Sequence, residues 1–410
     1  MRILLVAPYF PPRRSSFPSR WAWLAPALAD RGHSVEVLAM MSGPRQPENL
    51  RHVLATQPTI ERLRVRPILP VTHGQTIVQR SVVEAVMGVR ALVAGLKPTR
   101  TDVVVVSVPN LSLMPVGWLL ARIRRRPLVL DLRDAWPEIL DDWHEWNDDG
   151  QGGRRPLAAG KRLVFSAAVR VGSAALSSIR RSADAVVVTS EGLATHLQAQ
   201  GATNVTLVRN TSVKPWPYPL PPRTPDGELH VLYLGNVGRA QLLATAIRAT
   251  AIARQRGTQV VLRVVGTGPH WAAARKIARE TGAPVEFIDR VPITKVLPHY
   301  EWADTALVIL RDWNAMRHTV PSKVYEVMLS GRHISASLHG DTTGLVESLG
   351  AGDVVPPEDP EALADLWCAL AADRSRLQVS TRGRTWVQTA LSPERLTDEF
   401  EAVLRQVIDG

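Results

Sequence analysis

A basic and an acidic side chain stand close together at the start of a predicted helix in the second half of the chain. Lys323 and Glu326 follow Pro321, and Ser322 adds a hydroxyl at the same helix start. A lysine ammonium at such a place can hold a phosphate as a point charge. The Glu326 carboxylate can accept hydrogen bonds from two hydroxyl groups, or it can be a glutamate that the helix dipole favours at a helix start.

Glycines follow two predicted strands of the same half. Gly235 and Gly238 precede a helix, where bare backbone lets a phosphate approach N–H groups. Arg239 comes directly after them and is a candidate diphosphate clamp. Gly266 and Gly268 follow the next strand and could border a base, although such a pair also makes an ordinary turn.

Alternating strands and helices must position these groups. Short apolar runs predict strands in the first half at 3–7, 35–38, 102–107, 128–132, 185–189 and 205–208. They predict strands in the second half at 230–234, 260–265, 285–288, 306–310, 333–336 and 354–355. Helical spacing predicts the main helices at 82–96, 113–124, 157–181, 240–256 and 270–281. The fold class is therefore α/β, with two doubly wound Rossmann-like domains facing an interdomain cleft and ligand sites in the loops after the strands.

A proline-rich segment predicts the domain boundary. Six prolines lie between Lys214 and Asp226, which favours a stiff, extended connector. We expect an N-terminal Rossmann-like domain at 1–213, a linker at 214–228 and a C-terminal Rossmann-like domain at 229–390. A last helix at 391–410 is expected to pack back toward the N-terminal domain.

Composition excludes several classes of protein. The 410 residues are 45% hydrophobic and 21% charged, which excludes wholesale disorder, collagen-like repeats and a multispanning membrane protein. A single cysteine, Cys368, excludes a disulfide-stapled or cysteine-rich zinc fold. The first apolar run is too short for a signal peptide, so we expect a cytoplasmic protein. The Gly-x-Gly-x-x-Gly fingerprint is absent after the first strand, which argues against an NAD site there.

The net charge of +11 is confined to the first half of the chain. Residues 1–215 hold 28 Lys/Arg and 16 Asp/Glu, a net +12, which leaves −1 for residues 216–410. Such a half predicts a polyanionic partner, such as nucleic acid, an anionic membrane or a phosphorylated acceptor; a genome that favours arginine is the other explanation. We expect no nucleic-acid partner, because the arginines are dispersed and no DNA- or RNA-binding module is recognisable.

One predicted helix, at 157–181, mixes basic and apolar side chains. Its basic residues are Lys161, Arg162, Arg170, Arg180 and Arg181. This mixture permits peripheral contact with an anionic membrane on its inner face, or packing on the helix's own domain.

Six segments together resemble the retaining glycosyltransferases of the GT-B fold, family 4. They lie at 9–12, 29–35, 131–138, 234–238, 265–268 and 320–326, so that the resemblance covers nearly the whole chain. The nearest branch comprises bacterial transferases that build surface polysaccharides from amino- or deoxysugars. The resemblance implies transfer of a sugar, as a hexosyl or N-acetylhexosaminyl group, from a nucleotide diphosphate sugar to a hydroxyl acceptor with retention of configuration. It implies that the domain at 1–213 binds the acceptor and that the domain at 229–390 binds the nucleotide sugar. A UDP-sugar is the first expectation for the donor, and neither a metal nor another cofactor is expected.

On the donor side, the resemblance implies that Glu326 binds the ribose hydroxyls. Asn236 and Gln241 stand about where the family has an arginine and a lysine, which leaves the diphosphate to Lys323 and Arg239. Many members carry a glutamate eight residues before the one at 326, where this chain has His318. The sugar contact is therefore expected from His318 or from the loop at 340–344, which contains Thr342.

On the acceptor side, a charged group ends a strand of the first domain. Asp131, Arg133 and Asp134 are the predicted catalytic residues, and Arg133 takes roughly the place of a histidine that other members hold near the sugar. A structural Asp–Arg ion pair at a loop is the alternative. Three further residues replace or flank the usual glycine-rich loop after the first strand and are the predicted acceptor contacts: Ser15, Ser16 and Arg20.

Several functions remain open at this point. A lipid-linked acceptor would account for the basic first half, whereas a small natural-product acceptor would not require it. A catalytically silent relative is suggested by Asn236, Gln241 and His318. A nucleotide-sugar epimerase of the same fold would need carboxylates that we do not identify. The acidic stretch at 141–149 invites a metal site, but its spacing matches no standard one, and a flexible loop is the better prediction.

Overall fold

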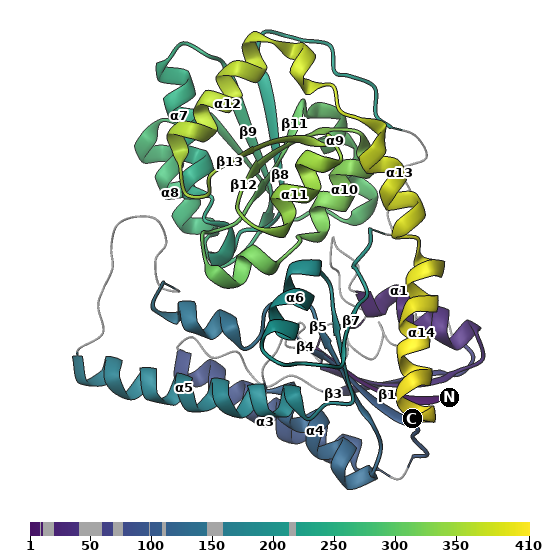
Figure 1. Cartoon of the computed structure of the whole chain (residues 1–410). Coiled ribbons are helices and arrows are strands. Elements are labelled where there is room, and N and C mark those ends of the chain that lie inside the picture. Colours follow the sequence, from purple (N-terminus) through teal and green to yellow (C-terminus); the bar gives the residue numbers. More distant parts are fainter. Residues whose placement is uncertain are drawn as a thin grey trace. The chain divides into compact units, whose positions relative to one another are not determined.

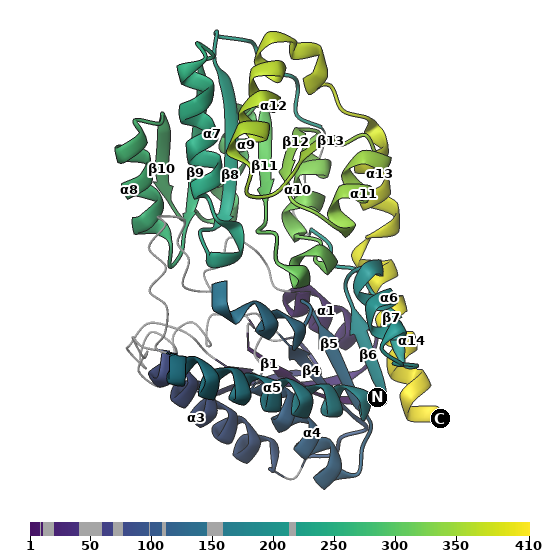
Figure 2. The ribbon, with the colours of Figure 1, turned by 60° about the vertical axis from the view of Figure 1, so that its left-hand side comes forward.

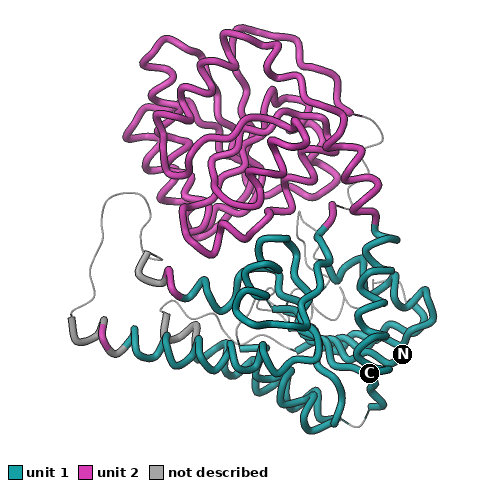
Figure 3. The backbone as a smooth tube through the Cα atoms, in the orientation of Figure 1, with its two compact units in different colours: residues 1–140, 164–210, 393–410 teal, residues 141–163, 211–392 magenta. Residues whose placement is uncertain are grey.

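The computed structural model describes most of the chain as two compact units (Figure 3). The described residues are 1–8, 10, 20–40, 60–68, 77–97, 99–108, 112–145, 159–212 and 219–410. Unit 1 comprises Met1–Leu140, Val164–Asn210 and Pro393–Gly410, and unit 2 comprises Asp141–Leu163 and Thr211–Ser392. The predicted acceptor contacts Ser15 and Ser16 lie outside the described residues.

Unit 1 is built on a parallel sheet of seven strands in the order β3-β2-β1-β4-β5-β6-β7. Its strands are β1 (Arg2–Ala7), β2 (Ser34–Met40), β3 (Leu63–Ile68), β4 (Val103–Val108), β5 (Leu128–Leu132), β6 (Ala185–Val188) and β7 (Val205–Leu207). All of β4 and β5 is buried, as expected of apolar runs in a sheet that helices cover on both faces. The chain reverses its winding direction at β1, which lies between β2 and β4.

The helices of unit 1 flank this sheet (Figures 1 and 2). They are α1 (Arg20–Asp30), α3 (Ile77–Gly95), α4 (Leu113–Arg124), most of α5 (Ala159–Arg181), α6 (Glu191–Ala199) and α14 (Pro393–Asp409). The 3-10 helix η1 (Glu138–Glu145) begins in unit 1, and its residues from Asp141 on belong to unit 2. The final helix α14 packs on α1, where the Trp21 and Phe400 rings meet edge to face with centroids 5.2 Å apart. An ion pair of 3.0 Å between Arg31 and Glu401 reinforces this contact. The last helix therefore belongs to unit 1, although it follows unit 2 in the sequence.

Unit 2 is built on a parallel sheet of six strands in the order β10-β9-β8-β11-β12-β13. The strands are β8 (Leu229–Asn236), β9 (Val260–Thr267), β10 (Val285–Asp289), β11 (Thr305–Ile309), β12 (His333–Ser337) and β13 (Gly352–Val355). The main helices are α7 (Ala244–Gln255), α8 (Trp271–Thr281), α9 (Leu297–Trp302), α10 (Ser322–Ser330), α11 (Asp341–Ser348), α12 (Pro360–Ala372) and α13 (Thr381–Ala390). Short 3-10 helices are η2 (Arg239–Gln241), η3 (Ile293–Lys295), η4 (Asn314–His318) and η5 (Arg374–Leu377). Trp367 of α12 is fully buried in the core over β8 and β9.

Two elements of unit 1 were missed in the sequence. The strand β3 alternates Arg64 and Arg66 with apolar residues, because it is a half-exposed edge strand; Arg66 pairs with Glu36 of β2 at 2.6 Å. The helix α6 is only nine residues long and starts at Ser190, whose hydroxyl accepts a hydrogen bond from the Leu193 N–H. The predicted acidic loop at 141–149 differs in its first part, because residues 138–145 form a 3-10 helix; residues 146–149 lie outside the described residues.

The described part of the proline-rich connector is held to unit 2. The Leu220 N–H donates to the Ser330 carbonyl at 2.8 Å, and Arg332 donates to the Pro221 carbonyl at 2.8 Å. These bonds order residues 219–228 against α10, so this part is a packed segment of unit 2.

One residue of the predicted membrane-contacting helix faces the interior. Arg180 of α5 is 4% exposed and donates to Glu138 at 2.7 Å and to the Trp136 carbonyl at 3.1 Å. The expectation that Arg180 meets a membrane is therefore wrong, because its charge is already paired inside unit 1. Among the described helices, none is long and apolar enough to cross a bilayer.

Candidate functional site

The candidate site lies where the sheet of unit 2 changes winding direction. β8 is the first strand of this sheet and lies between β9 and β11. The connections leaving β8 and β11 diverge at such a point, which opens a crevice at the carboxyl ends of the strands. Two segments therefore border the site: the loop after β8 and the chain between β11 and α10.

Lys323 joins these two segments. It is the second residue of α10, and its Nζ lies 4.0 Å from the centroid of the Tyr233 ring of β8. A Cβ atom added to Gly235 would lie 2.9 Å from the same Nζ, so the amine lies directly against the end of β8. Burial lowers the pKa of Lys323 to about 7, and the charge of Glu326 partly opposes this shift. An amine in this state can gain a proton when an anion enters the site.

Glu326 lies on the same helix, nearly enclosed. Its exposed fraction is 2%, and its carboxylate accepts a hydrogen bond from the Tyr300 hydroxyl of α9. Burial and the neighbouring carboxylate raise the pKa of Tyr300 well above its usual value, so this phenol stays a donor. Tyr300 did not stand out in the sequence, because nothing in its local pattern relates it to a residue on α10. Ser322, at the start of α10, is exposed.

The loop after β8 closes on itself. The Gly238 N–H donates to Oε1 of Gln241 at 3.2 Å, and the Ala240 carbonyl accepts from the N–H of Arg311 at 2.8 Å. Gln241, one of the two departures from the family pattern, thus stabilises the loop that carries Arg239. A Cβ atom at Gly238 would lie 2.5 Å from Nδ2 of Asn236, so the exposed side chain of the other departure lies against Gly238.

Gly266 and Gly268 have a packing reason to be glycine. A Cβ atom at Gly266 would lie 1.8 Å from the Gly235 carbonyl oxygen, and one at Gly268 would lie 2.2 Å from the Val237 carbonyl oxygen. The end of β9 thus approaches the end of β8 closely. Their glycine identity is therefore explained without a bound base.

The two candidate sugar-contacting segments meet. Gly340 has a φ of +87°, and a Cβ atom there would lie 1.9 Å from the Arg317 carbonyl oxygen. The Thr342 hydroxyl donates to the Thr319 carbonyl at 3.0 Å. The loop that opens α11 is thereby held against the segment that contains His318, which is partly exposed. Thr342 itself is fully buried with its hydroxyl in use, so its expected donor contact is corrected to a role in holding this loop.

Two predicted residues of unit 1 form a buried cluster. The Asp131 carboxylate lies 3.6 Å from Nε of Arg20 and accepts a hydrogen bond of 2.9 Å from the Trp21 indole. Arg20 also donates to the Val208 carbonyl at 2.7 Å. Asp131 is 0% exposed and Arg20 is 3% exposed. The structure corrects their expected catalytic and acceptor-binding roles: they hold α1 against the sheet, because neither side chain reaches the surface.

Arg133 and Asp134 follow β5 directly and stay partly exposed. Burial raises the pKa of Asp134, and the charge of Arg133 acts in the opposite direction. Nε of Arg133 is buried without a hydrogen-bond partner among the described residues. Such a group is costly to leave unpaired and is a natural place for a ligand oxygen. These two residues remain candidates at the carboxyl end of the unit 1 sheet.

Two family models match the chain, one on each half. A model described as "Glycosyl transferase 4-like domain" matches residues 19–211, and one described as "Glycosyl transferases group 1" matches residues 228–373. The chain carries the two domains of a glycosyltransferase. No curated protein matches it.

Solved structures show that this glycosyltransferase has the GT-B fold. Sucrose-phosphate synthase from Thermosynechococcus elongatus is 19% identical with a TM-score of 0.72, over 100% of this chain and 99% of that one. HepE from Anabaena in complex with UDP is 15% identical with a TM-score of 0.64, over 99% and 100%. WaaG, a glycosyltransferase involved in lipopolysaccharide biosynthesis, is 14% identical with a TM-score of 0.64, over 99% and 100%. At these identities the likeness concerns the fold.

One cluster in the described part of the glycosyltransferase has the composition of a metal site. Ligand atoms of Asp226, Glu228 and His230 lie within 4.8 Å of one another. Both oxygens of Asp226 already accept hydrogen bonds from Arg223, at 2.7 and 2.8 Å. The Arg223 guanidinium lowers the pKa of Asp226 far below its usual value. This cluster is therefore accounted for as an ion-pair network at the start of unit 2.

Proposed function

We propose that this glycosyltransferase moves a sugar from a nucleotide diphosphate sugar, a UDP-sugar first, to a hydroxyl acceptor with retention of anomeric configuration. The observation that carries the proposal is the contact of Lys323 with the end of β8, which sets a titratable amine and the Glu326 carboxylate at the switch point of unit 2. The structure of HepE with UDP supports the choice of nucleotide by analogy of fold.

The donor side of the reaction follows from charge. As the bond from sugar to diphosphate breaks, negative charge develops on the diphosphate, and fixed positive groups lower the barrier. Lys323 and Arg239 are the proposed cations, and the N–H groups of the loop at 235–241 are the proposed backbone donors. Glu326 is proposed to bind the ribose hydroxyls, in exchange for its hydrogen bond from Tyr300. His318 is proposed to contact the transferred sugar.

The proposed retention follows the usual proposal for this family. The acceptor hydroxyl attacks the face of the sugar that the diphosphate leaves, within a tight ion pair, and the diphosphate takes up the hydroxyl proton. Such a step needs no second catalytic carboxylate and no metal ion. Arg133 and Asp134 of unit 1 are the groups proposed to orient the acceptor.

The proposed acceptor is a lipid-linked sugar in the synthesis of a cell-surface polysaccharide or glycoconjugate. The net +12 of residues 1–215 favours a phosphorylated acceptor. A small natural-product acceptor is the alternative, and it would not require the positive charge of residues 1–215. Assays with polyprenyl-diphosphate sugars and with small hydroxylated acceptors separate the two.

The donor site is tested by thermal unfolding with a panel of nucleoside diphosphates and their sugars. At a ligand concentration about 100 times Kd, binding stabilises the folded protein by about 2.7 kcal/mol. We expect this shift with UDP or one of its sugars, and its loss in Glu326→Ala. Glu347→Ala, an exposed glutamate on α11, is the matched control and should keep the shift. An equal shift in Glu326→Ala and the unaltered protein would refute the placement.

A catalytically silent relative is the second candidate. Asn236 lies against Gly238 and Gln241 stabilises the loop after β8, where the family has charged side chains. Release of UDP from a UDP-sugar in the absence of acceptor separates the two functions. A silent relative would show the thermal shift but no release.

A further inference from the structure

Large apolar side chains gather on the outside of two neighbouring helices of unit 1. On α3, Val82, Val86, Val89 and Val93 are 37–62% exposed, and Leu96, which directly follows α3, is 46% exposed. On α4, Leu119 and Ile123 are 36% and 52% exposed. Figures 1 and 2 show these helices side by side, and a Cβ atom at Gly95 of α3 would lie 2.6 Å from the Leu120 side chain of α4. Elsewhere in the described chain, exposure of this kind is found at Leu163 and Val171 of α5 and at Ile293 of unit 2.

Val82, Val86, Val89, Val93 and Leu96 form one stripe along α3 and its C-terminal end, which we call the apolar stripe. Their spacing of four and three residues sets them in a line along the helix. Met87 and Ala91, which are buried, occupy the opposite side. A surface helix normally turns polar side chains outward, whereas the outer face of α3 carries apolar side chains. Arg90 and Lys97 flank the stripe, and the one acidic residue of α3, Glu84, lies on the opposite side.

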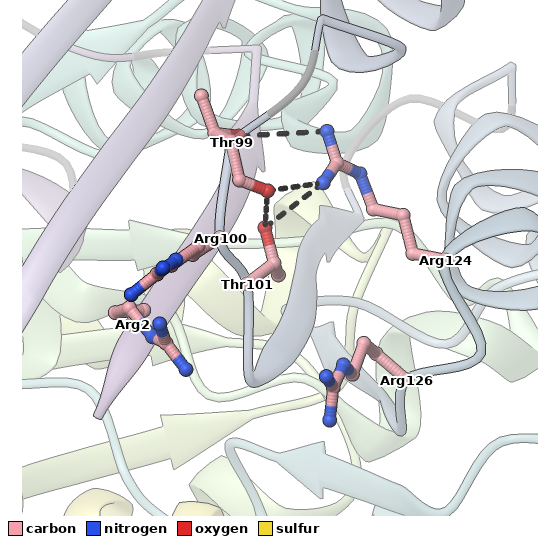
Figure 4. Close-up of a pocket in the computed structure, with 6 residues that line it drawn as sticks. All are labelled: Arg2, Thr99, Arg100, Thr101, Arg124 and Arg126. Carbon is pink, nitrogen blue, oxygen red and sulfur yellow. Dashed lines mark hydrogen bonds between the residues drawn. The ribbon is translucent and has the colours of Figure 1, made fainter.

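A basic hollow lies where α3 and α4 end (Figure 4). Its volume is about 510 Å³, within the size range of ligand sites. We call it the arginine hollow, and its lining residues are Arg2, Thr99, Arg100, Thr101, Arg124 and Arg126.

Arg124 connects the arginine hollow to the apolar stripe. Its guanidinium donates to the carbonyl groups of Gly95 and Lys97 at the end of α3, at 2.5 and 2.7 Å. It also donates to Thr99 and Thr101, as Figure 4 shows. The hollow and the carboxyl-terminal end of the stripe are therefore parts of one rigid surface.

The charge of the arginine hollow is only partly neutralised. Arg2 is paired with Asp102 at 2.6 Å. Arg100 and Arg126 are exposed, and the described residues offer them no hydrogen-bond or ion-pair partner. Among the residues that the structure describes, no carboxylate lines the hollow, and the nearby Asp184 carboxylate accepts a hydrogen bond from the Leu128 N–H at 2.8 Å. Two guanidinium groups are thus available to a phosphate, which they can bind with several hydrogen bonds each.

We propose that this face docks on an anionic lipid bilayer, with the apolar stripe in the headgroup region and a lipid phosphate in the arginine hollow. Basic residues next to an apolar helix face are the combination that anionic bilayers bind. A second copy of the chain is disfavoured, because two surfaces of the same positive charge would meet. Nucleic acid would leave the apolar stripe without a partner. The docking would bring the enzyme to the bilayer that holds the proposed lipid-linked acceptor. Its biological role rests on that proposed function, but the docking itself is argued from this surface alone.

The test is co-sedimentation of the full chain with vesicles, without any nucleotide or sugar. One set of vesicles contains phosphatidylcholine alone, and the other contains phosphatidylcholine with phosphatidylglycerol. We expect binding to the second set only. The double variant Arg100→Gln/Arg126→Gln should bind about 30-fold more weakly, since each basic residue near an anionic bilayer contributes about 1 kcal/mol. Val89→Asp/Val93→Asp should abolish binding.

Matched controls come from exposed residues of unit 2. Arg254→Gln/Arg279→Gln removes the same charge from α7 and α8, and Ile293→Asp alters an exposed apolar residue; both should bind vesicles as the unaltered protein does. Far-ultraviolet circular dichroism and the unfolding midpoint check that each variant is folded. Because the vesicle assay omits nucleotide and the thermal-shift assay omits vesicles, either proposal can fail alone.

Three results would overturn the docking. The first is equal vesicle binding by the stripe, hollow and control variants, or no binding by any of them. The second is a dimer in light scattering that dissociates in Val89→Asp/Val93→Asp, without vesicle binding. The third is binding of DNA or RNA that is lost with the arginine variant, again without vesicle binding.

Discussion

Nucleotide binding should be coupled to the uptake of one proton by Lys323. In the free protein, burial holds the pKa of this amine at about 7. At pH 8 about nine-tenths of the molecules therefore carry a neutral amine. A bound diphosphate favours the charged form, because an opposite charge close by raises the pKa of an amine.

The sign and size of the effect follow from this difference. Below about pH 7 the amine is already charged, so binding takes up no proton and affinity is flat with pH. Above about pH 7 the neutral amine of Lys323 must take up a proton from solution when a nucleotide binds. The affinity for the nucleotide therefore falls by up to about tenfold per pH unit. At pH 8 the expected uptake is about 0.9 proton for each UDP bound if the amine regains its usual pKa.

Isothermal titration calorimetry measures this uptake directly. The apparent enthalpy of UDP binding is determined at one pH in buffers of different ionisation enthalpy, and the slope of the plot is the number of protons taken up. Lys323→Met should bind more weakly and show a slope near zero. Lys295→Met, an exposed lysine of η3, is the control and should keep the slope. A zero slope in the unaltered protein, or an unchanged slope in Lys323→Met, would refute the assignment.

Three further substitutions test the packing. Gly235→Ala sets a Cβ atom 2.9 Å from the amine of Lys323 and should reduce the thermal shift by UDP; Gly172→Ala, on α5 with no atom within 4 Å, should leave that shift intact and raise the free energy of unfolding by about 0.5–1 kcal/mol. Asp131→Ala removes the carboxylate that faces the buried guanidinium of Arg20 and should cost about 3–5 kcal/mol in urea unfolding of unit 1; a loss below about 1 kcal/mol would contradict the buried pairing. Phe400→Ala removes the ring that packs on α1 and should cost about 3–5 kcal/mol, and a neutral result would mean that α14 does not pack there.

Local patterns in the sequence were enough to place most elements. The helix at 113–124 and the strand at 128–132 have the predicted bounds, because apolar residues repeat at helical spacing in the first and fill every position except Asp131 in the second. The edge strand β3 was missed because arginines interrupt its pattern. The alternation of strands and helices predicted parallel sheets, whereas the order of the strands, and so the position of the switch point between β8 and β11, comes from the structure.

The use of each polar side chain was decided by tertiary contacts. Asp131 and Asp134 differ by three positions, yet one is sealed by Trp21 and the other stays at the strand end. Thr342 and His318 were equal candidates for the sugar contact in the sequence. In the fold, the Thr342 hydroxyl donates a hydrogen bond to the Thr319 carbonyl, 23 positions away. Residue type and spacing determine which elements form and which chemistry they could carry. Whether a given side chain meets a ligand depends on distant partners, since burial and hydrogen bonds come from chain segments far apart in the sequence.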